Sequence, residues 1–298
     1  MSEKREWDVR GKTILVTGGN SGIGRATALE LARRGAHVVI TARDPKKGAA
    51  AVAELSAQLQ PDAGLLEWRL LDLADARSIR EFSAAFLAEF AALDVLVHNA
   101  GLVLSERRET QDGFEATFGT NHLGPFLLTQ LLTERLAASS PARVVVVASD
   151  AHRQARGGLD FNDLQAQGSY SGVKAYGRSK LANILFARAL ARRLEPRGVT
   201  VNALHPGVVA TGFTKDGDAG GLWGFVFRWL RPLLLTPEKG ARTSVYLASS
   251  PEVSDITGAY FAKERAKSPS AAARDDAAAE QLWEVSGALV ATAGRGAL

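Results

Sequence analysis

The segment TILVTGGNSGIG, at residues 13–24, decides the fold of this chain. A short apolar run leads directly into a loop with glycines at positions 18, 22 and 24, and a helical segment follows at residues 21–34. Glycines at these positions permit a tight turn and let the backbone approach a pyrophosphate at the N-terminus of the helix. Gly-x-x-x-Gly-x-Gly is not the common dinucleotide spacing, so the position between strand and helix favours a phosphate loop over a plain turn. The expected phosphate contacts are Gly18, Asn20, Ser21, Gly22, Ile23 and Gly24.

Short apolar runs alternate with helical stretches along the rest of the chain. The runs lie at residues 13–17, 38–41, 65–71, 95–98, 144–149 and 200–205, with a shorter one at 259–261, and the helical stretches at 21–34, 45–60, 76–90, 113–137 and 174–194. The runs are apolar throughout rather than alternating, as in strands of a parallel sheet that is buried on both faces. The pattern predicts an α/β fold, a Rossmann-like doubly wound parallel sheet of about seven strands with helices on both faces.

No linker or repeat interrupts this pattern, so we expect a single domain over residues 1–298. Within it, a cofactor half covers about 11–150 and a catalytic and substrate half about 151–265. The C-terminal extension, 268–298, is rich in alanine and carries a helical patch at 277–289.

The composition excludes several classes of protein. The chain has no cysteine, which rules out disulfides, thiol nucleophiles and cysteine metal sites and suits a reducing cytoplasm. The net charge of +4 is spread among acidic residues rather than massed, so we expect no nucleic-acid partner. Residues 1–10 lack the apolar region of a signal peptide, and no run reaches the ~18 apolar residues of a membrane span. We therefore expect a cytoplasmic protein.

Ala42-Arg43-Asp44 ends the second strand, about 20 residues after the glycine loop, where an adenosine ribose would lie. Asp44 could bind a ribose diol, which would indicate NAD, whereas Arg43 could pair with a 2′-phosphate, which would indicate NADP. Asp44 precedes Pro45 and a helical stretch, so it has a local use as the N-cap of that helix. Arg43 has no such use, and a guanidinium suits phosphate, so the sequence favours NADP over NAD.

Two further strand ends carry candidate cofactor contacts. Asp72 and Leu73 close the third strand, where a carboxylate could meet an adenine amino group, although a helix cap is the alternative. Asn99, Ala100 and Gly101 close the fourth strand, small residues where a backbone must approach a ligand. We interpret His98, just before them, as structural.

Tyr176 and Lys180 lie one turn apart on the same face of the helical stretch 174–194. A free phenol titrates near pH ~10 and is a poor acid or base at neutrality. A nearby ammonium favours the phenolate and lowers the phenol's pKa. Such a pair is also common on helix surfaces, so the pair alone does not identify a catalytic site.

Five motifs occur in the order and spacing of one known family, namely the glycine loop at 17–24, Asn-Ala-Gly at 99–101, Ser149, Tyr176-x-x-x-Lys180 and Pro206-Gly207. Over about residues 11–265 the chain resembles the short-chain dehydrogenase/reductase family. Finer features resemble its retinol-dehydrogenase-like branch, namely NHLGPF at 121–126, SKLAN at 179–183, HPGVV at 205–209 and LWEVS at 282–286.

The resemblance implies a role for each motif residue. Tyr176 would be the general acid/base, and Lys180 would lower its pKa and hold the nicotinamide ribose. Ser149 would bind the substrate oxygen, and Asn121 would anchor a water relay toward Lys180. Taken alone, Ser149 and Asn121 are ordinary polar residues. The segment after the sixth strand would wrap the nicotinamide through Pro206, Gly207, Val209 and Thr211.

The chain departs from the family pattern at three places. Ala148 precedes Ser149 where many members carry a second serine, and His98 stands where many carry asparagine. Ser21 replaces the basic residue that NADP-preferring relatives often have in the loop, so the NADP prediction depends on Arg43 alone.

Residues 212–240 combine glycines at 216–221 with an aromatic-rich apolar stretch at 222–230. Following Thr211, this segment is expected to form a lid over a lipophilic substrate. Packing on the protein's own body or on another subunit is one alternative, and contact with a membrane surface is another.

We therefore expect an NADP(H)-dependent oxidoreductase that needs no metal and acts on a lipophilic alcohol or carbonyl, for example a retinol-like or steroid-like compound. A non-catalytic NADP-binding sensor or scaffold and a nucleotide-sugar epimerase or dehydratase are the alternatives. By resemblance, the chain would form a homodimer or homotetramer through the helices that carry Asn121 and Tyr176.

Overall fold

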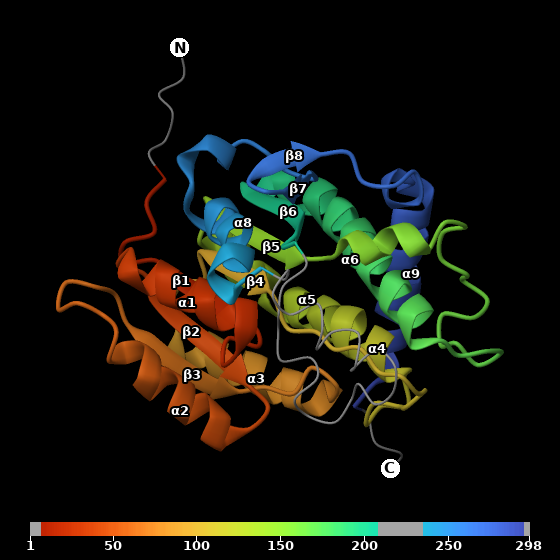
Figure 1. Cartoon of the computed structure of the whole chain (residues 1–298), viewed down its shortest axis with the longest axis horizontal. Coiled ribbons are helices and arrows are strands. Elements are labelled where there is room, and N and C mark those ends of the chain that lie inside the picture. The colour runs from red at the N-terminus through yellow and green to blue at the C-terminus, as the bar shows by residue number, and fades with distance from the viewer. Residues whose placement is uncertain (1–6, 208–234, 295–298) are drawn as a thin grey trace.

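A computed structural model describes residues 7–207 and 235–294 of the chain (Figure 1). One eight-stranded sheet has the order β3-β2-β1-β4-β5-β6-β7-β8. Its strands are β1 Thr13–Val16, β2 His37–Ala42, β3 Leu66–Leu70, β4 Val95–His98, β5 Ala142–Val147, β6 Val199–His205, β7 Tyr260–Ala262 and β8 Arg265–Lys267. β1 to β7 are parallel, so the predicted doubly wound parallel sheet is confirmed.

β8 is the one strand of this sheet that the sequence did not predict. It pairs antiparallel with β7 through a two-residue turn, in which Lys263 and Glu264 have positive φ of 52° and 61°. Two-residue hairpins of this hand favour Asn-Gly, so Lys-Glu carries no hairpin signal. All three residues of β8 are exposed, and the strand therefore lacks an apolar pattern as well.

Helices cover both faces of the sheet (Figure 1). Ile14 and Val16 of β1 pack with α1 Gly22–Arg33, α2 Pro45–Ser56 and α8 Pro237–Ser249. Leu15, between them, faces the other side and joins the core formed with α3 Ala76–Glu89, α5 Gly124–Ala138, α6 Gly172–Leu194 and α9 Asp276–Thr292. Opposite faces of one strand thus carry alternate residues, and both are buried. Within the described ranges, no helix is both long and apolar enough to cross a membrane.

The helix predicted at 113–137 is broken. It consists of α4 Ala116–Phe118, a π-helical turn Gly119–Leu123 and α5. A Cβ on Gly119 would lie 2.6 Å from a Thr110 methyl carbon, and one on Gly124 would lie 2.3 Å from the Leu73 carbonyl oxygen. The glycines therefore let the backbone press against its neighbours on both sides of the π-helical turn, a feature that is frequent at functional sites.

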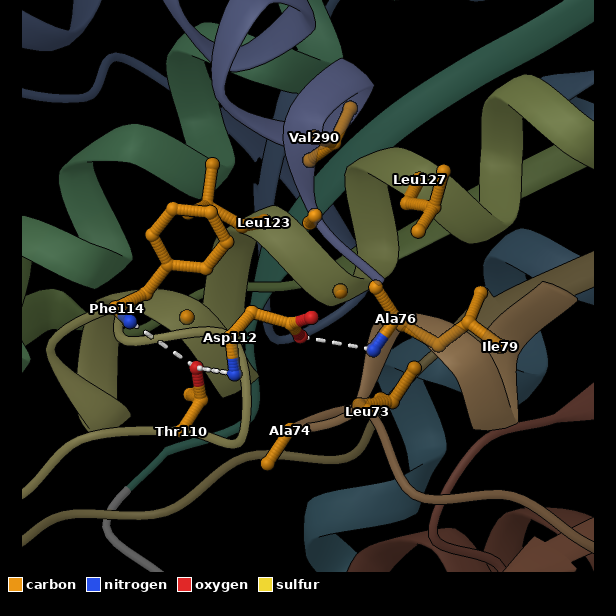
Figure 2. A pocket seen from close by; sticks show the side chains of 13 residues that line it. Leu73, Ala74, Ala76, Ile79, Thr110, Asp112, Phe114, Leu123, Leu127 and Val290 are labelled. Carbon is orange, nitrogen blue, oxygen red and sulfur yellow. Dashed lines mark hydrogen bonds between the residues drawn. The ribbon is translucent and has the colours of Figure 1, made fainter. Parts of the chain in front are cut away.

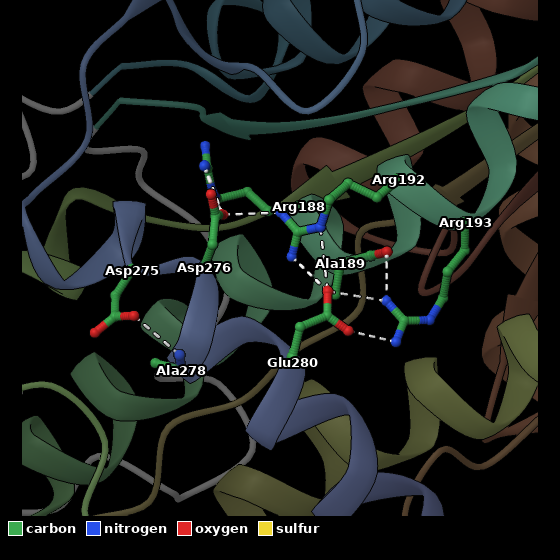
Figure 3. A network of polar contacts seen from close by, with 8 residues as sticks. All are labelled: Arg188, Ala189, Arg192, Arg193, Asp275, Asp276, Ala278 and Glu280. Atoms are coloured by element: carbon green, nitrogen blue, oxygen red, sulfur yellow. Dashed lines mark hydrogen bonds and ion pairs between the residues drawn. The ribbon is translucent and has the colours of Figure 1, made fainter.

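α9 is tied to α6 by a network of ion pairs (Figure 3). Asp276 pairs with Arg188 and Arg192 at 2.8 Å, and Glu280 pairs with Arg192 at 2.7 Å and with Arg193 at 2.5 Å. The hydrogen bonds from the two guanidiniums lower the pKa of Glu280 to about 2. These side chains are partly exposed, so each pair contributes at most about 1 kcal/mol.

Aromatic packing holds the middle of α9. The Trp283 ring stacks on Phe186 of α6 at 6.1 Å between centroids and meets Phe126 of α5 edge-on at 4.9 Å. Beside this cluster, Ser286 of α9 hydrogen-bonds His122 of the π-helical turn at 2.8 Å.

The end of α9 meets α3. Asp112 accepts hydrogen bonds from the backbone N–H of Ala76 at 2.9 Å and of Gly294 at 2.8 Å. Val290 and Leu127 line a small cavity beside it (Figure 2). α9 thus lies over α5 and α6, and any association of copies through those helices has to accommodate it.

Candidate active site

The glycine loop joins β1 to α1 and packs closely on the end of β4. Gly18 and Gly22 have positive φ of 64° and 53°, which L side chains rarely adopt. A Cβ on Gly18 would lie 3.0 Å from Ala100 Cβ, and one on Gly24 would lie 2.3 Å from Asn99 Nδ2. Side chains at these positions would fill the space in which loop and strand end meet.

Thr17 fixes the loop against the Asn-Ala-Gly segment. Its Oγ1 accepts hydrogen bonds from the N–H of Asn99 at 3.0 Å and of Ala100 at 3.1 Å. The Asn99 amide donates back to the Thr17 carbonyl at 2.9 Å. In addition, the N–H of Gly18 donates to Thr41 Oγ1 on β2 at 3.3 Å. Two residues without an assigned role, Thr17 and Thr41, thus set the shape of the loop.

The tip of the loop leads into α1. Ser21 is its exposed N-cap residue, and the Ser21 side chain makes no capping hydrogen bond with the described part of the chain. Asn20 is half-buried, and Ile23 is buried in the first turn. Because helix N-terminal N–H groups carry a partial positive charge, this end of α1 suits an anion such as a pyrophosphate.

At the end of β2, Arg43 and Asp44 make different contacts. The Asp44 carboxylate accepts from the N–H of Lys46 at 2.8 Å and of Lys47 at 3.2 Å, and so caps α2. Arg43 lines a cavity of about 280 Å³ that extends from β2 to α4. The cavity is lined by Arg43, Ala74, Leu102, Leu104, Arg108, Glu109, Thr110, Ala116 and Thr120.

Thr120 supplies an unsatisfied polar atom to this cavity. Its Oγ1 is buried and has no hydrogen-bond partner within the described ranges. Since buried hydroxyls are generally bonded, this atom marks a place where a ligand could bond. The glycine loop, Arg43 and this cavity together fit a dinucleotide.

Asp72 and Leu73 lie beside this cavity, after β3. The Asp72 carboxylate accepts from the N–H of Ala74 at 2.9 Å, and Leu73 is buried. The cap of α3 is Asp75, which accepts from the N–H of Arg77 at 2.8 Å. Asp72 is therefore not the helix cap that was its alternative use.

Three of the predicted catalytic residues come together at the end of β5. Ser149 follows this strand as the N-cap of the short 3-10 helix Asp150–Gln154, and its side chain lies close enough to Tyr176 of α6 to lower the pKa of the phenol. One turn further along α6, the buried Lys180 donates from Nζ to the Val147 carbonyl at 3.0 Å. The strand end thus holds both ends of the Tyr-x-x-x-Lys motif.

Asn121 joins this cluster through contacts with the main chain of Leu102 and the hydroxyl of Ser179. Its amide accepts from the Leu102 N–H at 2.7 Å and donates to the Leu102 carbonyl and to Ser179 Oγ, both at 2.9 Å. A Cβ on Gly101 would lie 3.1 Å from Asn121 Oδ1 and 3.4 Å from Lys180 Nζ. Asn121 therefore holds the segment after Asn-Ala-Gly against α6, next to the ammonium.

Burial controls the ionisation of the two titratable groups. It lowers the pKa of Lys180 to about 8. It raises the pKa of the Tyr176 phenol, and the hydrogen bond to Ser149 opposes this rise. Lys180 Nζ, bound to the Val147 carbonyl, lies 5.5 Å from the centre of the tyrosine ring.

Only part of the predicted nicotinamide segment is described. Pro206 and Gly207 follow β6, and Gly207 has a positive φ of 91°. A Cβ there would lie 2.5 Å from Leu235 Cδ1, so the turn brings residue 235 close. Val209 and Thr211 lie outside the described residues.

The predicted lid, 212–240, also lies mostly outside them, including the aromatic stretch 222–230. Its last residues are described and belong to α8, which begins at Pro237. Thr236 caps this helix by accepting from the Lys239 N–H.

Two more residues near Ser149 were not singled out from the sequence. Ser179 receives the Asn121 amide bond, and His152 is completely buried with its ring against the Ser149 carbonyl. Ser179 precedes Lys180 in the motif and could have been noted. The partners of His152 are distant in sequence, so no local pattern indicates them.

A family model described as enoyl-(acyl carrier protein) reductase matches residues 18–263. Retinol dehydrogenase 12 from Mus musculus is 45% identical over 278 residues, which cover 93% of this chain and 86% of the relative. Retinol dehydrogenase 14 from Homo sapiens is 44% identical over 294 residues, 95% and 87% of the two chains. The chain belongs to the short-chain dehydrogenase/reductase family. Within it, the chain lies in the retinol-dehydrogenase-like branch.

Solved structures agree with this membership. An uncharacterized protein from Mycobacterium paratuberculosis superposes with a TM-score of 0.74 at 34% identity, covering 96% of each chain. RhlG from Pseudomonas aeruginosa, solved with NADP, has a TM-score of 0.68 at 28% identity, covering 86% of this chain and 96% of that one. This short-chain dehydrogenase/reductase is an NAD(P)-dependent oxidoreductase that acts on CH–OH groups.

Proposed function

We propose that the protein is an NADP(H)-dependent oxidoreductase for a lipophilic alcohol and its aldehyde or ketone, with Tyr176 as the general acid/base. One observation carries the proposal: Ser149 follows the strand end whose Val147 carbonyl binds the buried Lys180, one helical turn from Tyr176 on α6. Two hydroxyls therefore converge where one substrate oxygen can meet both.

In carbonyl reduction, Tyr176 donates its proton to the substrate oxygen, and in alcohol oxidation it takes that proton back. Ser149 bonds the same oxygen and orients it. Burial keeps the Tyr176 phenol protonated at neutral pH by raising its pKa, and the interaction with Ser149 opposes this rise. Lys180 adds positive charge beside the ring and would hold the ribose hydroxyls. The nicotinamide, when bound, supplies or accepts the hydride.

The residues for the cofactor are those of the glycine loop and the adjoining strand ends. The pyrophosphate would lie on Gly18, Asn20, Ser21, Gly22, Ile23 and Gly24, and the adenosine near Asp72, Leu73, Asn99, Ala100 and Gly101. Arg43 would bind a 2′-phosphate. NADP over NAD is supported by the capping bonds of Asp44, both of which go to Oδ1, one of the two oxygens that would hold a ribose diol. Pro206, Gly207, Val209 and Thr211 would complete the nicotinamide end.

The substrate class is proposed from the names of relatives and from the sequence of the predicted lid. Relatives at 44–45% identity are named retinol dehydrogenases, which supports a retinol-like compound. The apolar, aromatic stretch 222–230 supports a lipophilic substrate.

The cell compartment and the association of copies stay predictions. A chain without cysteine supports a reducing compartment, and we propose the cytoplasm, which cell fractionation would test. A dimer or tetramer would appear in light scattering at more than the mass of one 298-residue chain.

A substrate panel tests the function directly. Retinal, a long-chain aldehyde, an aromatic aldehyde and a steroid ketone are each offered with NADPH and, in parallel, with NADH. We expect turnover of at least one lipophilic carbonyl and a preference for NADPH. Tight NADPH binding with no turnover in either direction would instead support a cofactor-binding sensor.

A further inference from the structure

His152 lies three residues after Ser149, in the 3-10 helix Asp150–Gln154, and its side chain is completely buried. Its ring Nδ1 lies 2.7 Å from the Ser149 carbonyl oxygen. Its backbone N–H donates to the same oxygen at 3.1 Å. The carbonyl of the proposed substrate-binding serine is thus held twice by one residue.

The other side of the ring reaches the C-terminal extension. Nε2 of His152 lies 3.1 Å from the backbone N–H of Ser270. A backbone N–H can only donate, so Nε2 must be the unprotonated acceptor. The proton of the neutral ring is therefore on Nδ1, from which it is donated to the Ser149 carbonyl.

Buried neighbours fix the orientation of the His152 ring. Tyr260 of β7, itself buried, packs edge-on against it at 5.4 Å between centroids. Ser270 begins a short turn, in which Ala273 N–H donates to the Ser270 carbonyl at 3.1 Å, and Ala273 is completely buried. Nearby, Arg153 donates to the Ser268 carbonyl at 3.3 Å. The segment 268–274 is thus fixed beside the active-site loop.

We propose that His152 is a positioning residue: Ser270 sets its tautomer, and its Nδ1–H fixes the main chain of Ser149 and hence the direction of the Ser149 hydroxyl. The inference rests on the proposed role of Ser149. It assigns to Ser270, in the C-terminal extension, a part in the reaction.

Asparagine and glutamine at position 152 each retain one of the two hydrogen bonds that the histidine ring makes. In His152→Asn the amide nitrogen replaces Nδ1 and can still donate to Ser149. In His152→Gln the amide oxygen replaces Nε2 and can still accept from Ser270, but the Ser149 carbonyl loses its ring donor. His152→Phe removes both bonds and keeps a ring of similar size.

The test measures kcat for the best carbonyl substrate of the panel, the Kd for NADPH, and Tm. We expect roughly 10- to 100-fold lower kcat in His152→Gln and His152→Phe, since a small misplacement of a reacting group has effects of this size. His152→Asn should stay within about threefold of the parent, and NADPH affinity should be unchanged in all three. Parent-like kcat in His152→Gln, or an equal loss in all three variants, would overturn the proposal.

Ser270→Pro removes the N–H that sets the tautomer, with Ser270→Ala as its matched control. The proline should lower kcat in the parent but add no further loss in the His152→Asn background, because an asparagine amide has no tautomer to fix. An equal loss of kcat in both backgrounds would show that Ser270 does not act through the tautomer of His152.

Two results separate this inference from the proposed function. If Ser149→Ala keeps full activity, the role of Ser149 fails. If Ser149→Ala is inactive while His152→Gln is unaffected, only the positioning role fails. Independently of activity, imidazole ¹H–¹⁵N spectra should show the Nδ1–H tautomer for His152, and an Nε2–H tautomer would contradict the assignment.

Discussion

The Lys180 ammonium donates a 3.0 Å hydrogen bond to the carbonyl of Val147, the last residue of β5. Ser149 follows two residues later, so a single strand end sets the position of the serine and of the helix that carries Tyr176. The bond also explains how a lysine that is only 3% exposed is accommodated. It satisfies one of the three donors of a cation that is otherwise costly to bury.

Lys180→Met should make stability less dependent on pH in the alkaline range. The folded-state pKa of Lys180, about 8, lies below its ordinary value of 10.5. Folded protein therefore binds fewer protons than unfolded protein between these values, and this group makes the folded state gain stability as pH rises from 8 to 10.5. The variant lacks this gain, which is at most about 3 kcal/mol.

Urea unfolding of parent and variant at several pH values measures this effect. The stability of Lys180→Met relative to the parent should be highest near pH 7 and fall toward pH 10.5. A difference that is constant over that range would argue against a depressed lysine pKa.

Arg43→Ala should weaken NADPH binding by roughly 10- to 100-fold, because a charge-assisted hydrogen bond to phosphate contributes about 1.5–3 kcal/mol. NADH, which lacks the 2′-phosphate, should be little affected. Isothermal titration with both cofactors measures the two affinities. An equal loss for both would contradict the NADP assignment.

Asp44→Ala is the neighbouring control for this measurement. It removes the cap of α2, so it should reduce stability by about 1 kcal/mol while leaving the preference for NADPH unchanged. A marked loss of NADH affinity in this variant would indicate a direct role of Asp44 at the ribose.

Asn121→Ala should lower both stability and turnover. It leaves the N–H and carbonyl of Leu102 without their partner, at a cost of about 1–3 kcal/mol. Chemical unfolding and kcat measure the two effects. Thr120→Val is the matched control for stability, since the Thr120 hydroxyl has no partner among the described residues, and it should cost little. Parent-like stability in Asn121→Ala would contradict a stabilising role for the two hydrogen bonds between Asn121 and Leu102.

Trp283→Ala and Glu280→Gln distinguish packing from charge in the docking of α9. The tryptophan stacks on Phe186 and packs edge-on against Phe126, so its loss should cost roughly 2–4 kcal/mol. The exposed ion pairs of Glu280 should contribute less than about 1 kcal/mol, and less still at high salt. Thermal unfolding in low and high salt measures both. A larger effect for Glu280→Gln would reverse the ranking.

Much of the fold is predictable because its signals are local. Continuous apolar runs predicted the seven parallel strands, of which β4, Val95–His98, has the predicted bounds. The glycines at 18 and 22 signalled a turn, and both have positive φ. Asp44 before Pro45 predicted a capped helix, and the cap is present.

The features that the sequence did not predict depend on contacts between residues that are distant in the chain. The π-helical turn around Asn121 forms where Gly119 and Gly124 meet Thr110 and Leu73, and neither contact appears in the local sequence. The pKa of Tyr176 is raised by burial in the whole fold, which no local pattern indicates.

The most direct test of the central claim is Tyr176→Phe, assayed for NADPH consumption with the best lipophilic carbonyl of the panel. The variant removes one oxygen and keeps the ring. The account predicts a loss of kcat of roughly 10²- to 10⁴-fold, the range of a general acid, with NADPH affinity nearly unchanged. Substantial turnover by the phenylalanine variant would contradict the assignment of Tyr176 as the proton donor.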